Sequence, residues 1–447
     1  MISTAEVTLA SFLCSIAFFL IGLIILKISI KSNFKIARNL FIIIYFLNIL
    51  LSNAIIGERI HKTGKPYYGS DDETYEANAL LLTEFSYVKN MKMLDYLSGG
   101  YTHGSKYYTA FMGSFINGIK LIGLNYHYLI FCYLNALFVA LTGVVAFSFA
   151  RLIGLKDGRS ELVSFVIGMW PSYVYNSAMI RRDTVFIFFL FLSAYLITSM
   201  FSRKKNTTVR EIFLLALSIT IVSYLRIFYG LLVFFIIFLI LILFYRSIVR
   251  PNNYLVRYVS ISLFTISILF IMRIIMPSLV IYFDKLAWYY ELYSLTRSDT
   301  FHGGGILSSI FTYSPIISIP LRLLFSFASP PPVPNFSLIF GNINWFGTII
   351  WFFLSPYLFW ALYDIYNKKR RESIEIKIIA IFFIIIFFSG IAIAFSEEHA
   401  LAGRLLGILL LFYGLENWSV SFKSVFSFLS LFGMYLTCLY LTVKIFL

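Results

Sequence analysis

Charged residues are scarce in this sequence. Only 13% of its 447 residues are Asp, Glu, Lys or Arg, whereas 60% are hydrophobic and the mean hydropathy is +0.85. Water-soluble domains are about 25% charged, so the chain has too little polar surface to cover a soluble globule. Its repeated apolar runs of about 18–25 residues are each long enough to cross a hydrocarbon core of roughly 30 Å. The sequence therefore predicts an integral membrane protein.

Cysteine and histidine are also rare. The three cysteines, Cys14, Cys132 and Cys438, lie inside apolar runs, where they indicate neither a disulfide framework nor a cysteine metal site. No two of the five histidines have zinc-like spacing, and the sequence has no P-loop or dinucleotide-binding motif. The net charge is +15, but Lys and Arg are confined to short clusters between apolar runs, which is typical of membrane orientation signals. No nucleic-acid partner is expected; the expected surroundings are the lipid bilayer.

The apolar runs predict an all-α polytopic membrane protein with about twelve transmembrane helices in a single domain, 1–447. Two connections are much longer than the others. The first, 57–126, is expected to be a large outer loop with an acidic motif, and the second, 281–344, is an outer loop with Gly-rich and Pro-rich segments. An apolar stretch at 306–328 is broken by prolines and an arginine, so we expect a re-entrant or interfacial segment before the late helices. The expected spans are 7–26, 40–56, 127–150, 161–179, 184–201, 211–225, 227–245, 256–280, 345–366, 374–395, 403–420 and 425–443.

Basic residues gather after every second expected span. With twelve spans, all of these clusters fall on one side, which the positive-inside rule identifies as cytoplasmic. We therefore expect a multi-pass protein of a bacterial inner (cytoplasmic) membrane, with both long connections on the non-cytoplasmic side. The clusters run from Lys27 to Arg38, Arg151 to Arg159, Arg203 to Arg210, Arg246 to Arg257 and Lys368 to Lys377.

The first long connection contains the acidic stretch Ser70-Asp71-Asp72-Glu73. Ser70 and Glu73 have the spacing of a capping box, and acids in a first helical turn favour the positive end of the helix dipole. The alternative interpretation is that Asp71 or Asp72 is a general base held at the membrane surface. Both interpretations stay open on local sequence, with Glu73 as an accessory residue.

Arginines and further acids recur at the outer ends of later spans. Charges at a membrane boundary are costly and usually face a partner, a cavity or a site, although single arginines also extend to lipid headgroups. Because Arg binds phosphate through paired hydrogen bonds and stays charged, the set suggests a substrate with an anionic headgroup and a lipid tail. The residues are Arg181, Arg182, Asp183, Arg226, Arg404 and, as accessory groups, Glu397, Glu398 and His399.

His103 and Lys106, in a Gly-rich part of the first long connection, are two more accessory candidates. A lone histidine in a loop is more often solvated than catalytic. No motif requires a cofactor. A divalent cation on Asp71 and Asp72 is left open, because two adjacent acids alone do not define a metal site.

Three features carry a family resemblance. The acidic stretch 69–75 lies in the first large outer loop, the segment 170–184 runs from Trp-Pro-Ser-Tyr to Arg-Arg-Asp-Thr, and Arg404 begins a late helix. Together they resemble the GT-C superfamily of polytopic glycosyltransferases, which use polyprenyl-phosphate sugars. The resemblance covers 40–200 and, more loosely, 340–420.

The resemblance implies roles for four of the candidates. Asp71 or Asp72 matches the loop carboxylate that serves as the base, Asp183 matches a second acidic position, and Arg404 matches an arginine near the lipid phosphate. The chain departs from the family pattern by an additional first helix at 7–26 and by an acidic pair that lies well beyond the end of the second span. These departures leave the identity of the base open.

The expected function is the transfer of a sugar from a polyprenyl-phosphate or diphosphate carrier to a glycan or lipid acceptor outside the cytoplasm, in surface-polysaccharide synthesis. One alternative is an O-antigen or polysaccharide polymerase, which uses the same class of donor. Another is a lipid-linked oligosaccharide flippase or other transporter, which would carry charges through the bilayer midplane. Arg273 is the clearest midplane charge, and the sequence indicates no pair of broken helices there.

Overall fold

The computed structural model describes residues 4–30, 33–67, 70–83, 103–202, 208–248, 339–367, 373–394 and 397–417, and the single positions 89, 317 and 320. Within this part of the chain every element of secondary structure is a helix. The prediction of an all-α membrane protein is confirmed, because six of these helices are long and apolar enough to cross a membrane. They are α1 (Thr4–Ser29), α2 (Phe34–Thr63), α6 (Tyr128–Leu152), α9 (Asp183–Phe201), α11 (Ile227–Ile248) and α16 (Ile374–Ala394).

Three more helices coincide with expected spans. They are α10 (Val209–Leu225), α15 (Ile343–Asn367) and α17 (Glu397–Asn417), and the short 3-10 helix η1 (Phe340–Asn342) leads into α15. The expected spans 256–280 and 425–443 lie outside the described residues. So does the expected re-entrant segment 306–328, except for two single positions.

The expectation of one continuous span at 161–179 is wrong. The chain forms α7 (Asp157–Gly168) and α8 (Pro171–Ser177), with a break at Met169 and Trp170. Proline lacks the backbone N–H that a continuing helix needs and restricts the residue before it, so Pro171 starts a new helix at its first position. α7 has 12 residues, so the break lies about 18 Å from its start, at 1.5 Å per residue. A broken helix is therefore present where the sequence indicated none.

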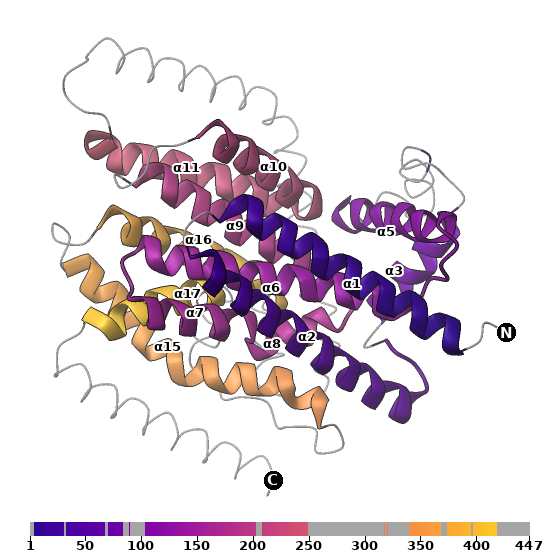
Figure 1. The fold of residues 1–447 in the computed structure, drawn as a ribbon. Helices are drawn as coiled ribbons and strands as arrows, with labels where there is room; N and C mark the ends of the chain where they lie inside the picture. The colour runs from indigo at the N-terminus through magenta and orange to yellow at the C-terminus, as the bar shows by residue number, and fades with distance from the viewer. Residues whose placement is uncertain are drawn as a thin grey trace, which may run out of the picture.

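The described part of the first long connection is largely helical. α2 continues to Thr63, and α3 (Ser70–Leu81) and α5 (His103–Leu121) follow it. Figure 1 shows α3 and α5 together at the right of the bundle, on the side where α2 ends. The two helices contact each other, and α5 also contacts α10.

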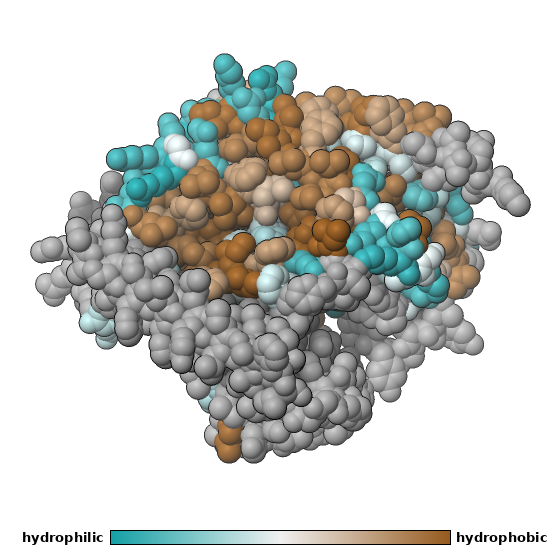
Figure 2. All heavy atoms as spheres, turned by 90° about the horizontal axis from the view of Figure 1, so that it is seen from below, coloured by the Kyte–Doolittle hydropathy of each residue, from teal (hydrophilic) through white to brown (hydrophobic). Residues whose placement is uncertain are grey.

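α6 forms the centre of the bundle. It contacts α1, α2, α7, α8 and α9. In its apolar stretch 83% of the residues are buried, compared with 33% in α1 and 28% in α11. The outer helices leave large apolar side chains such as Phe12 and Leu243 exposed. On the face seen in Figure 2, apolar residues cover most of the described surface, and hydrophilic residues gather mainly in patches toward its margins. This surface suits a lipid environment, because monomeric soluble proteins rarely expose large contiguous apolar patches.

Contacts between distant segments define one end of the bundle, which we call the basic end. Arg210 Nη1 donates to the Ile28 carbonyl at 2.8 Å, so α10 begins where α1 finishes. Ser202 Oγ donates to Glu375 Oε1 at 2.6 Å, so α9 ends where α16 begins. Arg159 and Glu416, 3.5 Å apart, join the start of α7 to the end of α17. The described members of the predicted basic clusters lie at this end.

Candidate functional site

The opposite end of the bundle, which we call the site end, holds a buried ion pair between α3 and the α8–α9 loop. Arg181 Nε donates to Asp72 Oδ1 at 2.9 Å, and the two side chains are 10% and 0% exposed. Arg181 lies in the five-residue link 178–182, just before α9. Asp72 lies in the first turn of α3, where an acid also favours the positive end of the helix dipole. Two predicted candidates from separate segments thus meet.

A second buried pair lies at the first residue of α9. Asp183 Oδ1 accepts hydrogen bonds from Arg226 Nε, at 3.1 Å, and from Arg226 Nη2. Both side chains are about nine-tenths buried. The Arg226 guanidinium also lies over the Phe186 ring, 5.3 Å from its centroid. Two N–H groups of one guanidinium therefore fix one carboxylate oxygen, which is a strong, geometrically specific contact.

Tyr108 of α5 packs edge-on against Tyr75 of α3, with ring centroids 5.8 Å apart. Its side chain is buried, and burial raises the pKa of the phenol. The negative charges of Asp183 and Asp72 raise that pKa further, so the phenol stays protonated. α5 packs against α3, which carries Asp72, and against α10, which ends just before Arg226.

Two further side chains hold the backbone of the link that carries Arg181. Arg59 Nη1, from the last turns of α2, donates to the Ala178 carbonyl at 3.1 Å, and its guanidinium lies 5.1 Å from the centroid of the Tyr175 ring. Asn135 Nδ2, from α6, donates to the Met179 carbonyl at 2.7 Å. Arg59 and Asn135 are both buried. The position of Arg181 is therefore set from α2, α3 and α6 together.

Glu76 is a third buried acid at this end. It is 6% exposed and lies one turn after Asp72 on the same face of α3. Tyr126 Oη donates to Glu76 Oε1 at 2.6 Å, and Tyr67 Oη donates to Glu76 Oε2. Burial and the adjacent Glu76 carboxylate raise the pKa of both phenols, so both remain donors.

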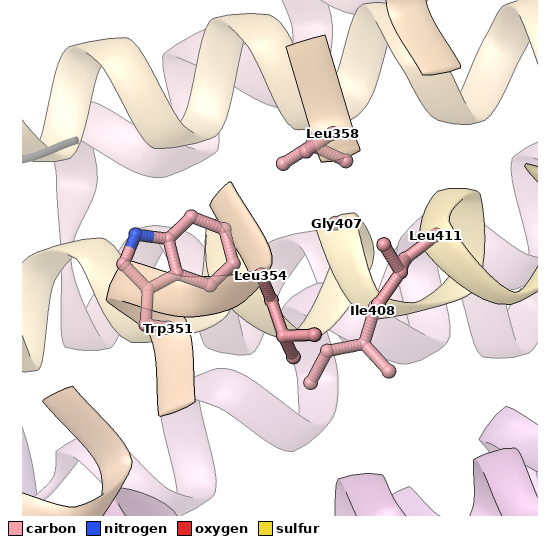
Figure 3. Close-up of a pocket in the computed structure, with 6 residues that line it drawn as sticks. All are labelled: Trp351, Leu354, Leu358, Gly407, Ile408 and Leu411. Atoms are coloured by element: carbon pink, nitrogen blue, oxygen red, sulfur yellow. The ribbon is translucent and has the colours of Figure 1, made fainter. Parts of the chain in front are cut away.

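Arg404 lies eight residues into α17 and is 6% exposed. Its guanidinium lies 5.3 Å from the centroid of the Trp351 ring of α15. Toward the basic end, apolar side chains of the two helices surround a narrow recess that is too small to hold a water molecule. Leu354 and Leu358 of α15 face Ile408 and Leu411 of α17 across Gly407, next to Trp351 (Figure 3).

The remaining predicted residues are not shown as members of the two buried ion pairs. Glu73 is on the exposed side of α3 and pairs with Lys65 at 2.9 Å. Lys106 lies over the Tyr107 ring, and Arg182 is half-buried at the N-terminal boundary of α9. The residues whose helical position is described but whose side chains lie outside the description are Asp71, His103, Glu397, Glu398 and His399.

No cluster of three or more His, Cys, Asp or Glu side chains in the described ranges is arranged to hold a metal ion. The described oxygens of Asp72 and Glu76 face arginine and tyrosine donors instead. The divalent cation stays an open alternative for Asp71.

Sequence reasoning missed Arg59, Glu76, Tyr108, Tyr126 and Asn135. Glu76 could have been found from its spacing, because residues four apart share a helix face and Asp72 was already a candidate. Asn135 is a polar residue in the middle of an apolar run, which is a usable signal for a buried partner. Nothing local marks the two tyrosines among the 31 in the chain.

Comparison with protein-family models, with curated proteins and with solved structures finds no match. The chemistry of the site therefore has to be inferred from its own residues. Buried arginines beside carboxylates bind anionic groups and orient a base.

Proposed function

We propose that this chain is a membrane glycosyltransferase of surface-polysaccharide synthesis. It would move a sugar from a polyprenyl-phosphate or diphosphate carrier to a glycan or lipid acceptor on the non-cytoplasmic side of a bacterial inner membrane. The observation that carries the proposal is the convergence of the Arg181–Asp72 and Arg226–Asp183 pairs at the end of the bundle away from the basic clusters. By the positive-inside rule, that end is the non-cytoplasmic one.

The proposed reaction needs a base and a stabilised leaving group. The acceptor hydroxyl oxygen attacks the anomeric carbon, its proton passes to an aspartate carboxylate, and the bond between the anomeric carbon and the phosphate oxygen breaks. The electron pair leaves on the phosphate oxygen, where arginine stabilises the charge. Asp72 or Asp71 is the proposed base. Because Arg181 occupies Asp72 Oδ1, a donor phosphate that binds Arg181 would compete with this pair.

The surroundings of Arg404 support a lipid-linked donor. Trp351 is 2% exposed, and its Nε1 has no hydrogen-bond partner among the described residues. An indole N–H and a stacked guanidinium are both donors suited to a phosphate. An isoprenoid tail would have to widen the narrow apolar recess lined by Leu354, Leu358 and Ile408, or lie on the apolar surface of these helices.

A polysaccharide polymerase would use the same donor and the same residues. The two functions differ in their product: a polymerase gives a ladder of lengthened glycans, and a transferase gives one added sugar or block.

A flippase or transporter is favoured by one specific observation, the broken helix α7–α8. Asn48 Nδ2 donates to the Gly168 carbonyl at the break, at 3.2 Å, and Ser177 Oγ donates to Asn48 Oδ1 at 3.4 Å. Broken helices with polar partners occur at transporter binding sites. Here the polar groups at the break are neutral and bonded to one another, whereas the charged groups lie at the site end. We therefore rank transfer above transport.

The test is the chemistry of lipid-linked intermediates in a deletion strain. Loss of a transferase leaves a lipid-linked sugar and a glycan acceptor that lacks one unit, both of which return to normal when the gene is restored. Loss of a flippase leaves a complete lipid-linked oligosaccharide on the cytoplasmic face. The second result would replace the proposed function with transport.

A further inference from the structure

We propose that Glu76 is a positioning residue: its carboxylate, held by the phenols of Tyr67 and Tyr126, fixes α3 so that Asp72 is presented to Arg181. The part of this inference that concerns catalysis rests on the proposed function. The part that concerns the position of α3 does not.

Glu76 joins three segments of the chain. Tyr67 lies in the link before α3, and Tyr126 lies in the link before α6, so the two hydrogen bonds close the segments around α3. The Tyr67 ring also packs edge-on against Tyr128, the first residue of α6, with centroids 5.6 Å apart. α3 is thereby tied to the entrance of the central helix α6.

Asp72 lies on the same face of α3 as Glu76, so the contacts that hold Glu76 also hold Asp72 in position. Residues four apart lie one above the other on a helix, so Asp72, Glu76 and Ala79 form one buried face. Glu73 lies about a quarter turn around the helix from this face, and its side chain is 51% exposed. A rotation or a loosening of α3 would move Asp72 away from Arg181, so the hydrogen bonds of Glu76 control the position of Asp72 through the helix.

The hydrogen bonds that Glu76 already accepts favour a positioning role over proton transfer. Both of its oxygens already accept phenol hydrogens, and the raised pKa values of Tyr67 and Tyr126 keep those hydrogens in place. A base needs an oxygen open to the acceptor. Glu76 is therefore suited to hold a helix, and Asp72 is left to face the arginine.

The first experiment measures the docking of α3 without any assay of activity. Ala79→Cys places a thiol on the buried face, and Ala77→Cys places one on the exposed face. The reaction of each with a polar maleimide is followed in the detergent-solubilised full chain, after subtraction of labelling in the parent. The Ala79→Cys thiol is expected to react slowly, and Glu76→Gln is expected to speed it by about ten- to hundredfold, the range for a hydrogen bond to a charged group.

The controls are matched on the same helix. Glu73→Gln removes an acid from the exposed face and should leave the Ala79→Cys rate unchanged, and Ala77→Cys should react quickly in every background. Tyr126→Phe, which removes one hydroxyl and leaves the ring, should give a smaller increase than Glu76→Gln. Equal Ala79→Cys rates in the Glu76→Gln and Glu73→Gln backgrounds would overturn the positioning role.

The second experiment tests the consequence for transfer. Glu76→Gln and Tyr126→Phe should lower the turnover number, because Asp72 is no longer held in place, and should not raise the KM for the lipid donor, because Asp72 then competes less with the donor phosphate for Arg181. A loss of transfer in Glu76→Gln with no change in maleimide reactivity would overturn positioning in favour of a direct chemical role. If the reactivity changes as expected but the wild-type protein transfers no sugar, the proposed function fails and the positioning of α3 stands.

Discussion

Arg181 Nε lies 2.9 Å from Asp72 Oδ1, although 109 residues separate the two in the sequence. The pair connects a helix of the first long connection to the link between α8 and α9. It also puts one of the two acids proposed as the general base beside an arginine suited to a phosphate. The stability of the fold and the proposed chemistry therefore depend on the same contact.

Breaking this pair from one side should destabilise the protein. Removing one partner of a buried ion pair leaves an uncompensated charge and typically costs about 3–5 kcal/mol. Arg181→Ala should therefore lower the thermal unfolding midpoint in detergent, and Asp72→Asn combined with Arg181→Gln should lower it less. Lys65→Ala, at the exposed pair with Glu73, is the control and should cost about 0–1 kcal/mol. Equal effects of Arg181→Ala and Lys65→Ala would contradict the buried pair.

Gly403 should not tolerate a side chain. A Cβ there would lie 2.7 Å from Phe387 Cα and 2.9 Å from Phe387 N, so α17 and α16 would have to separate. Overpacking of this kind typically costs about 1–3 kcal/mol, and Gly403→Ala should lower the unfolding midpoint. Gly57→Ala is the matched control, because nothing lies within 4 Å of its Cβ position and alanine favours a helix by about 0.5–1 kcal/mol. A neutral Gly403→Ala would show that α16 and α17 pack less closely.

Arg404 should matter for use of the lipid donor. A hydrogen bond to a charged group contributes about 1.5–3 kcal/mol, so Arg404→Ala should reduce transfer by about ten- to hundredfold with near-normal protein levels in the membrane. Arg404→Lys should restore part of the activity, because lysine keeps the charge and loses the planar fork. The assay is a titration of lipid-linked donor in membranes from a complemented deletion strain. Full activity of Arg404→Ala would mean that the arginine only packs on Trp351.

The two ends of the bundle should be accessible from opposite sides of the membrane. Cysteines at Glu73 and at Lys35, both on described helices at opposite ends, report this in whole cells with an impermeant maleimide. We expect labelling at position 73 from outside and at position 35 only after permeabilisation, because the basic end should be cytoplasmic. The reverse pattern would remove the basis for a non-cytoplasmic lipid donor.

Much of the fold was predictable because apolar length dominates membrane insertion. The runs at 7–26 and 184–201 coincide with α1 and α9 to within a few residues. The prediction of one span at 161–179 was wrong for a physical reason. Hydropathy measures only how apolar a segment is, whereas Pro171 interrupts the backbone hydrogen bonding and separates α7 from α8.

The site was predictable in its residue types and not in its pairings. Arg181, Asp183 and Arg226 stand out as charges beside apolar runs, but no spacing says that Arg226 rather than Arg181 binds Asp183. Glu76 was hidden by the acidic stretch before it, where helix-start effects explain every acid equally well. Which acid is buried depends on the packing of α3 against α5 and on the tyrosines of the neighbouring links, and that information is not local.

The identity of the base tests the account most directly. The measurement is sugar transfer from a polyprenyl-phosphate donor by membranes that contain Asp71→Asn, Asp72→Asn or Glu73→Gln at equal protein levels. The loss of a general base typically slows a reaction by about 10²–10⁴-fold, whereas an Asn at position 71 that only favours a helix start costs about 0.3–1 kcal/mol. The unfolding midpoint of Asp72→Asn is measured as well, because this variant also breaks the buried pair with Arg181. We predict that Asp72→Asn or Asp71→Asn abolishes transfer and that Glu73→Gln is mild. Wild-type transfer by both Asn variants would contradict the catalytic assignment of the acidic stretch.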